Sequence, residues 1–278
     1  MKKLFLIFLI FSTPIFCENN FFKNITLRQS FQSKNDKAEP ASFTFTNPKD
    51  GESSFLINTA LGINLFPYNE NLTFSPFIEY HRNTLIDKEQ FTYSGGAFFE
   101  WVAIKITGKE IKWVPILIAS AKYNNDRKKD IESFMGNIYV AILNPLSNIN
   151  LGKVASLEFY PYFGIENENR MKTENQSDKG NIYRFFLRLN LVLNPFNNVK
   201  SMMGKIQISF DYQYRYDFST FLKDLSKKHN YFTADLNYQL FQSNKLSAVV
   251  GLEYVNGEDP TQGFEKQSYY ALLFKIKL

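Results

Sequence analysis

The chain of 278 residues contains one cysteine and two histidines, which is too few for several kinds of site. Cys17 has no second cysteine with which to form an intrachain disulfide, and His81 and His229 lie far apart in the sequence. No tight cluster of carboxylates and no phosphate-binding glycine loop accompanies them. We therefore expect no metal centre and no cofactor.

Long apolar runs are also scarce, since the only one lies at the N-terminus. Lys2 and Lys3 precede the apolar residues 4–11, and a polar chain begins at Glu18. This order is typical of a secretory signal peptide, whose apolar stretch is too short to remain as a spanning helix. We predict a signal peptide at residues 1–17 and one barrel domain at residues 18–278. Cleavage there would remove the only thiol, although a lipid anchor on the cysteine remains an alternative.

Aromatic residues, in contrast, are abundant, because the chain has 29 phenylalanines and 16 tyrosines. The run from Gly204 to Asp217, GKIQISFDYQYRYD, alternates strictly between apolar and polar residues from Ile206 onward. Successive side chains of a strand point to opposite faces, so one face is apolar and the other is polar. The run suits a tilted strand of about 9 to 11 residues that crosses a bilayer, with lipid on one face and a polar lumen on the other.

Alternation and turn residues divide the chain into an even number of such strands. Alternate connections, among them residues 33–52, 167–180 and 218–230, are generally longer and more charged than the rest. This contrast is typical of a barrel with short periplasmic turns and long outer loops. The predicted fold class is all-β, a closed antiparallel transmembrane β-barrel of about twelve strands. The predicted strands are residues 22–32, 53–66, 72–83, 91–105, 113–123, 131–143, 153–166, 181–193, 204–217, 231–241, 245–256 and 268–278.

In this architecture the chain resembles bacterial outer-membrane β-barrels of the twelve-stranded size class, which includes porin-like channels. The last strand, SYYALLFKIKL, places Tyr270, Leu272, Phe274 and Leu278 on one face. This face resembles the C-terminal signal read by the barrel-assembly machinery, except that Leu278 replaces the usual terminal Phe or Trp. The resemblance implies the outer membrane of a diderm, Gram-negative-type bacterium. It also implies outer-membrane lipids, lipopolysaccharide and the assembly machinery as partners, and it indicates no specific subfamily.

The polar faces of the strands would line the lumen. They carry charges of both signs, which would either select solutes in a narrow channel or pair with each other and close the barrel. We favour passive passage of small polar or charged solutes, with Glu158 near Arg184 and Arg188, and these two near Asp211. The predicted pore-lining residues are Arg184, Arg188, Glu158, Asp211, Arg215, Asp235, Glu79, Glu100 and His81.

Two alternatives remain open. The first is a lipid-active hydrolase or acyltransferase, and the outer-membrane phospholipase of this size class places a serine two residues after its base histidine. Asn83 stands at that position after His81, and we expect His229 alone in a loop, so we assign no catalytic residue. The second is a closed structural or adhesive barrel that acts through its loops, in which residues 33–52 form either a plug or an extracellular loop.

The formal net charge of +5 is modest. Its basic runs, DRKKD at 126–130 and KDLSKK at 223–228, fall in predicted loops. Such runs are usually solvated loop charge, so we expect no nucleic-acid partner. Contact with anionic lipopolysaccharide is the alternative for these runs, and the sequence carries no signal for an oligomeric state.

Overall fold

The computed structural model describes residues 24–31, 40–46, 53–84, 89–103, 114–143, 149–173, 178–196, 205–221, 227–242, 247–260 and 264–277. The predicted signal peptide and Cys17 lie outside these ranges. Within them, no helix is long and apolar enough to cross a membrane.

All the strands in the described ranges belong to one sheet. Three of them are short: β1 (Ile25–Arg28), β2 (Ala41–Thr46) and β8 (Ile149–Leu151). The long strands are β3 (Ser54–Ile63), β4 (Leu72–Asn83), β5 (Gln90–Val102), β6 (Val114–Asp126), β7 (Ile131–Leu143), β9 (Ala155–Lys172), β10 (Gly180–Asn194), β11 (Ile206–Ser219), β12 (Lys228–Gln242), β13 (Ser247–Asp259) and β14 (Glu265–Lys277).

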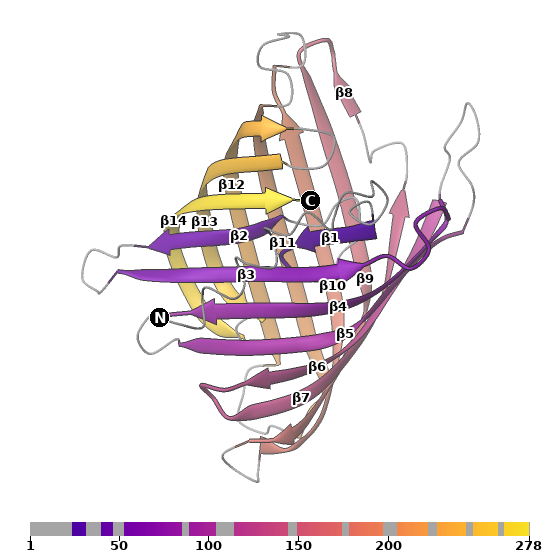
Figure 1. Cartoon of the computed structure of the whole chain (residues 1–278), viewed down its shortest axis with the longest axis vertical. Helices are drawn as coiled ribbons and strands as arrows, with labels where there is room; N and C mark the ends of the chain where they lie inside the picture. Colours follow the sequence, from indigo (N-terminus) through magenta and orange to yellow (C-terminus); the bar gives the residue numbers. More distant parts are fainter. Residues whose placement is uncertain are drawn as a thin grey trace, which may run out of the picture.

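The sheet closes on itself to form a barrel (Figure 1). From β3 the order runs β2, β14, β13, β12, β11, β10, β9, β7, β6, β5 and β4, and β4 pairs with β3 again. This circuit has twelve strands, each antiparallel to its neighbours, while β1 and β8 pair with β3 and β9 outside it. The predicted closed antiparallel barrel of about twelve strands is therefore confirmed.

The first strand of the circuit differs from the predicted one. β1 pairs with residues 60–63 of β3, whereas β2 pairs with residues 54–58 of β3 and with β14. β1 and β2 thus lie end to end along β3, and the chain leaves the wall after Arg28. The predicted strand at 22–32 is wrong beyond Arg28, and the predicted loop at 33–52 contains β2. Residues 32–39 and 47–52, on which the choice between plug and loop depends, lie outside the described residues.

The outward face of the wall is apolar on every strand of the circuit. Exposed large apolar side chains include Phe43 on β2, Ile165 on β9 and Leu252 on β13. On β11, Phe210 and Tyr216 are exposed on the outside. Soluble monomers rarely expose contiguous apolar patches beyond a few hundred Å², so a band around a whole barrel indicates contact with lipid.

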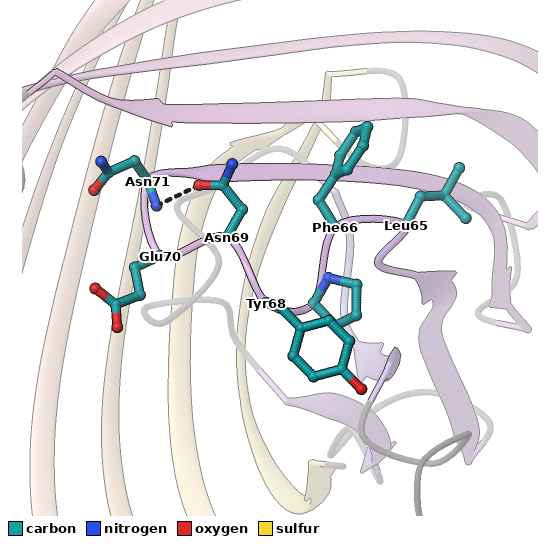
Figure 2. Close-up of a pocket in the computed structure, with 7 residues that line it drawn as sticks. Leu65, Phe66, Tyr68, Asn69, Glu70 and Asn71 are labelled. Carbon is teal, nitrogen blue, oxygen red and sulfur yellow. Dashed lines mark hydrogen bonds between the residues drawn. The ribbon is translucent and has the colours of Figure 1, made fainter.

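The connection between β3 and β4 is a tight turn, as predicted for residues 67–71 (Figure 2). The side-chain oxygen of Asn69 accepts hydrogen bonds from the backbone N–H groups of Asn71, at 3.0 Å, and Leu72, at 3.1 Å. Asparagine stabilises turns in this way because its side chain replaces a backbone acceptor.

At the opposite end the strands extend further than expected. β9 continues to Lys172 and β12 begins at Lys228. The predicted loops at 167–180 and 218–230 are therefore shorter than the sequence indicated. Strand pairing continues beyond the part of the wall that a bilayer requires, and this extension brings additional charged side chains into the barrel mouth.

Candidate functional site: the charged lumen

The predicted lining residues lie on the inner face of β4, β5, β9, β10, β11 and β12, alternating with the lipid-facing side chains. Most of them are buried, whereas Glu158 and Arg188 keep partial exposure. Their role as pore lining stays a prediction, and their contacts decide what the inner wall can do.

Arg184 binds two carboxylates that the sequence analysis did not select. Its Nη1 lies 2.7 Å from Glu168 on β9, and its Nε lies 2.9 Å from Asp217 on β11. Glu168 was missed because the strand was predicted to end at residue 166. Asp217 has the inward parity of Asp211 and Arg215, and this signal could have identified it.

Beside Arg184, further into the barrel and away from its mouth, four side chains from neighbouring strands form a compact layer. The Nε of Arg215 lies 2.8 Å from Glu166, and the Tyr139 hydroxyl donates a hydrogen bond of 2.5 Å to the same carboxylate. The guanidinium of Arg215 also stacks on Phe186, at 4.4 Å, and the rings of Tyr139 and Phe186 are 4.6 Å apart. All four residues are buried. We call Tyr139, Glu166, Phe186 and Arg215 the constriction layer.

On the side of the constriction layer away from Arg184 the inner wall is charged, and Arg188 and Ser209 keep partial exposure. The Nε of Arg188 lies 2.6 Å from Asp211 on the neighbouring strand β11. Asp235 on β12 receives hydrogen bonds from Ser209, at 3.0 Å, and from Lys275, at 3.1 Å. These contacts run along the wall, between strands that are neighbours or next but one.

The prediction that Glu158 lies near Arg184 is wrong. It stands opposite Val192 in the register of β9 and β10, whereas Arg184 stands opposite Glu166. Eight residues separate these two levels, which is roughly 26 Å along a strand. Glu158 instead accepts a hydrogen bond of 3.3 Å from Asn194.

On the opposite side of the barrel, Glu79 is the centre of a second polar cluster. The Nζ of Lys122 lies 2.6 Å from this carboxylate, and the backbone N–H of Phe31 donates a hydrogen bond of 2.7 Å to it. His81 lies 3.4 Å from Glu79 and 2.9 Å from Asn58, so both of its ring nitrogens are engaged. His81 faces the lumen and is 3% exposed, which does not suit a base acting on lipid outside the barrel.

The inner face is partly apolar on β4 to β6. Phe77, Phe98, Ile116 and Ile118 point inward and are buried. Phe31, on the chain that leaves the wall after β1, covers this surface, stacking on Phe77 at 4.6 Å and meeting Phe98 edge-on at 5.7 Å.

Arg28 completes the cluster around Phe31. Its guanidinium lies 4.3 Å from the centre of the Phe31 ring and 5.0 Å from that of Phe98. Glu100 on β5 attracts this guanidinium, whereas Arg188 on β10 repels it. The segment 28–31 therefore lies inside the barrel and narrows its bore.

The prediction that His229 is alone in a loop is also wrong. His229 lies in β12, between Asp217, at 3.4 Å, and Glu258, which it also contacts. The ring of Phe264 stacks on it with centres 4.5 Å apart, and Phe264 also lies over Arg184, at 4.5 Å. Phe264 therefore covers Arg184 and His229 on the side of the barrel mouth.

A cavity of about 160 Å³, lined mainly by polar and charged residues, lies in the mouth beside Phe264. We call it the vestibule. Two of its oxygens, Ser94 Oγ and Asn124 Oδ1, are buried without a hydrogen-bond partner in the structure. Buried polar atoms are normally satisfied, so these two favour a hydrogen-bonding molecule in the vestibule. Its lining includes His81, Gln90, Thr92, Ser94, Lys122, Asn124, Ser133, Glu168, Arg170 and Phe264.

Comparison with known proteins gives a structural likeness only. No protein-family model and no curated protein matches the sequence. The NanC porin superposes with a TM-score of 0.50 and 8% identity, over 86% of this chain and 98% of the porin. A structure from work on the in-meso crystallization of membrane proteins matches with a TM-score of 0.41 and 13% identity, over 86% of this chain and 81% of the other.

The first likeness covers most of both chains. At this identity it concerns the fold and carries no residue roles. By its fold, the chain is a porin-like, membrane-type β-barrel of twelve strands without a specific subfamily.

Proposed function

We propose that the barrel is a channel in the outer membrane through which small polar or charged solutes pass passively. The observation that carries the proposal is the course of the ion pairs. Arg184, Arg188 and Arg215 bind carboxylates on strands that are neighbours or next but one, so these pairs lie along the wall. A wall of paired charges leaves space in the bore and presents both signs to a solute.

The size of the barrel supports a narrow channel. Eight strands enclose an interior that side chains fill, whereas about 16 to 18 strands enclose a wide aqueous channel. This barrel has twelve strands, and Phe31 together with the constriction layer narrows it further. The proposed path of the solute runs from the vestibule at one end, through the constriction layer, to the partly exposed Arg188 and Ser209.

A swelling assay with protein-containing liposomes tests this function. The channel predicts uptake of small polar solutes that falls steeply with solute size. Ser209→Trp, on the inner face, should reduce uptake, whereas Ile208→Trp, one residue away on the lipid face, should not. Equal uptake by both variants would contradict the proposed path.

A closed barrel that acts through its loops is the second candidate, favoured by the burial of Tyr139 and Phe186 in the constriction layer. It predicts that wild-type liposomes do not swell with any solute, even when the protein is inserted and folded. The same assay therefore separates the two functions.

The location in the outer membrane of a diderm bacterium belongs to the same proposal. The lipid-facing band and the signal peptide predicted at residues 1–17 support it. Fractionation of cell envelopes on a density gradient should place the mature protein with outer-membrane markers, and recovery with the inner membrane would overturn this location.

A further inference from the structure

Two arginines lie over aromatic rings on the outward face of β4 to β6, at the end of the barrel opposite the tight turn of Figure 2. The guanidinium carbon of Arg82 is 5.0 Å from the centre of the Phe91 ring. That of Arg127, just after β6, is 5.1 Å from the Tyr93 ring and 5.9 Å from Phe91. The backbone N–H of Arg127 donates to the Phe91 carbonyl at 2.9 Å, which fixes its position beside β5.

These arginines differ from those of the lumen in their partners. Arg184, Arg188 and Arg215 each bind at least one carboxylate. Among the described residues, neither Arg82 nor Arg127 forms an ion pair, and their contacts are with aromatic faces. A guanidinium that stacks on a ring keeps its edge donors available, and these donors suit the oxygens of a phosphate group.

An apolar groove of about 490 Å³ crosses the lipid-facing wall below them. Its floor consists of small residues that are adjacent in the strand register, Ala97, Ala121 and Gly136. The lining also includes the large side chains Phe74, Phe99, Ile138, Ile165, Tyr183 and Phe218. This volume lies within the range of about 300 to 1,000 Å³ that is usual for small-molecule sites.

The arginines and the groove belong to one continuous surface. On the outer face of β5, Phe91 and Tyr93 are followed by Gly95, which has no side chain, and then by Ala97 in the groove. Six residues from Phe91 to Ala97 span roughly 20 Å along the strand. A ligand with an anionic head and an acyl chain can occupy both parts.

We propose that this surface binds lipopolysaccharide, with the phosphates of its lipid A on Arg82 and Arg127 and an acyl chain in the groove. The site lies at the end of the barrel toward which β9 and β12 extend beyond their predicted bounds, and the proposal places this end at the outer leaflet of the outer membrane. A second copy of the chain would have to bury two arginines without carboxylate partners, which is costly. The basic loop 126–130 thus contributes through Arg127.

Native mass spectrometry of the purified full chain with added lipid A tests the site. Each surface charge contributes about fivefold to the binding of an anionic lipid, so the double variant Arg82→Gln/Arg127→Gln should bind lipid A about 25-fold more weakly. The matched control, Lys153→Gln/Lys205→Gln, removes two exposed charges at the other end of the barrel and should bind as the wild type does. Unchanged binding by the arginine variant, or equal loss in the control, would overturn the proposal.

The groove is tested separately with Gly136→Phe. A Cβ atom at this position meets no atom within 4 Å, so the backbone has room for a side chain that would occupy the groove. We expect weaker binding of lipid A and an unchanged oligomeric state. A change in oligomeric state with lipid A binding intact would instead identify a second copy as the occupant. Equally tight binding of phosphatidylglycerol through the same arginines would overturn the choice of lipopolysaccharide. These measurements do not depend on whether the lumen conducts.

Discussion

Arg188, which keeps some exposure, pairs with the buried Asp211 on the inner wall. The pair carries no net charge, so it presents only a dipole to a passing ion. Losing one partner would leave a single charge in a narrow bore of low dielectric constant, where its field is strong. The selectivity of the channel should therefore depend on each pair remaining complete.

Replacing Arg188 with Gln should make the channel more selective for cations, because Asp211 then loses its partner. The reversal potential across a planar bilayer under a salt gradient measures this change. Lys153→Gln, which removes an exposed charge at the rim, is the control and should leave the reversal potential unchanged. A shift toward anions in Arg188→Gln would contradict the assignment.

Gly257 is a second residue whose role can be tested alone. Its φ is +119°, and a Cβ atom there would lie 2.1 Å from the carbonyl oxygen of Asn230. Gly257→Ala should destabilise the barrel by about 1–3 kcal/mol, the usual cost of a residue in a strained backbone conformation. The urea midpoint of unfolding measures this cost. Gly136→Ala, where the added atom meets open space, should not lower the midpoint.

Among the elements, β1 and the three residues after it determine how wide the bore is. Phe31 is fully buried against Phe77 and Phe98, and its backbone is held by Glu79. This short segment occupies part of the lumen and narrows it, although the sequence analysis predicted a wall strand there.

Removing the Phe31 ring should widen the channel. We expect Phe31→Ala to increase single-channel conductance and to lower the stability of the barrel by about 3–5 kcal/mol, as for other buried phenylalanines. Phe43→Ala on the lipid face is the control, and it should leave the conductance unchanged. If Phe31→Ala conducts as the wild type does, the segment does not limit the bore.

The sequence predicts some elements better than others for a physical reason. On β11 and β12 one face meets lipid and the other carries polar groups. The alternation of Phe210 with Asp211, or of Leu236 with Asn237, therefore predicts directly which side chains point outward. On β6, VPILIASA is apolar on both faces, because its inner residues pack against side chains that come from elsewhere in the chain. Such packing cannot be read from local alternation.

The same reason explains the outcome for the site. The inward parity of Arg184, Asp211 and Arg215 follows from the alternation alone. Which carboxylate meets which arginine depends on the register between strands and on where β9 ends. Glu166 and Glu168, and not Glu158, therefore lie beside Arg215 and Arg184.

At the scale of the whole molecule, the two faces of one sheet suit two different surroundings: the apolar outer band suits lipid, and the charged inner wall suits water. The fold follows from this division, since every backbone group of a closed barrel finds a partner within the wall. The function depends on whether the inner solvent is continuous from the vestibule to the opposite end.

Single-channel recording of the wild-type protein in planar bilayers tests this continuity most directly. Insertion of the folded barrel is verified independently by heat-dependent gel migration of the protein recovered from the bilayer lipid. The account predicts discrete conductance steps, smaller than those of wide 16-stranded porins because Phe31 and the constriction layer narrow the bore. The absence of any conductance step with folded, inserted protein would contradict it.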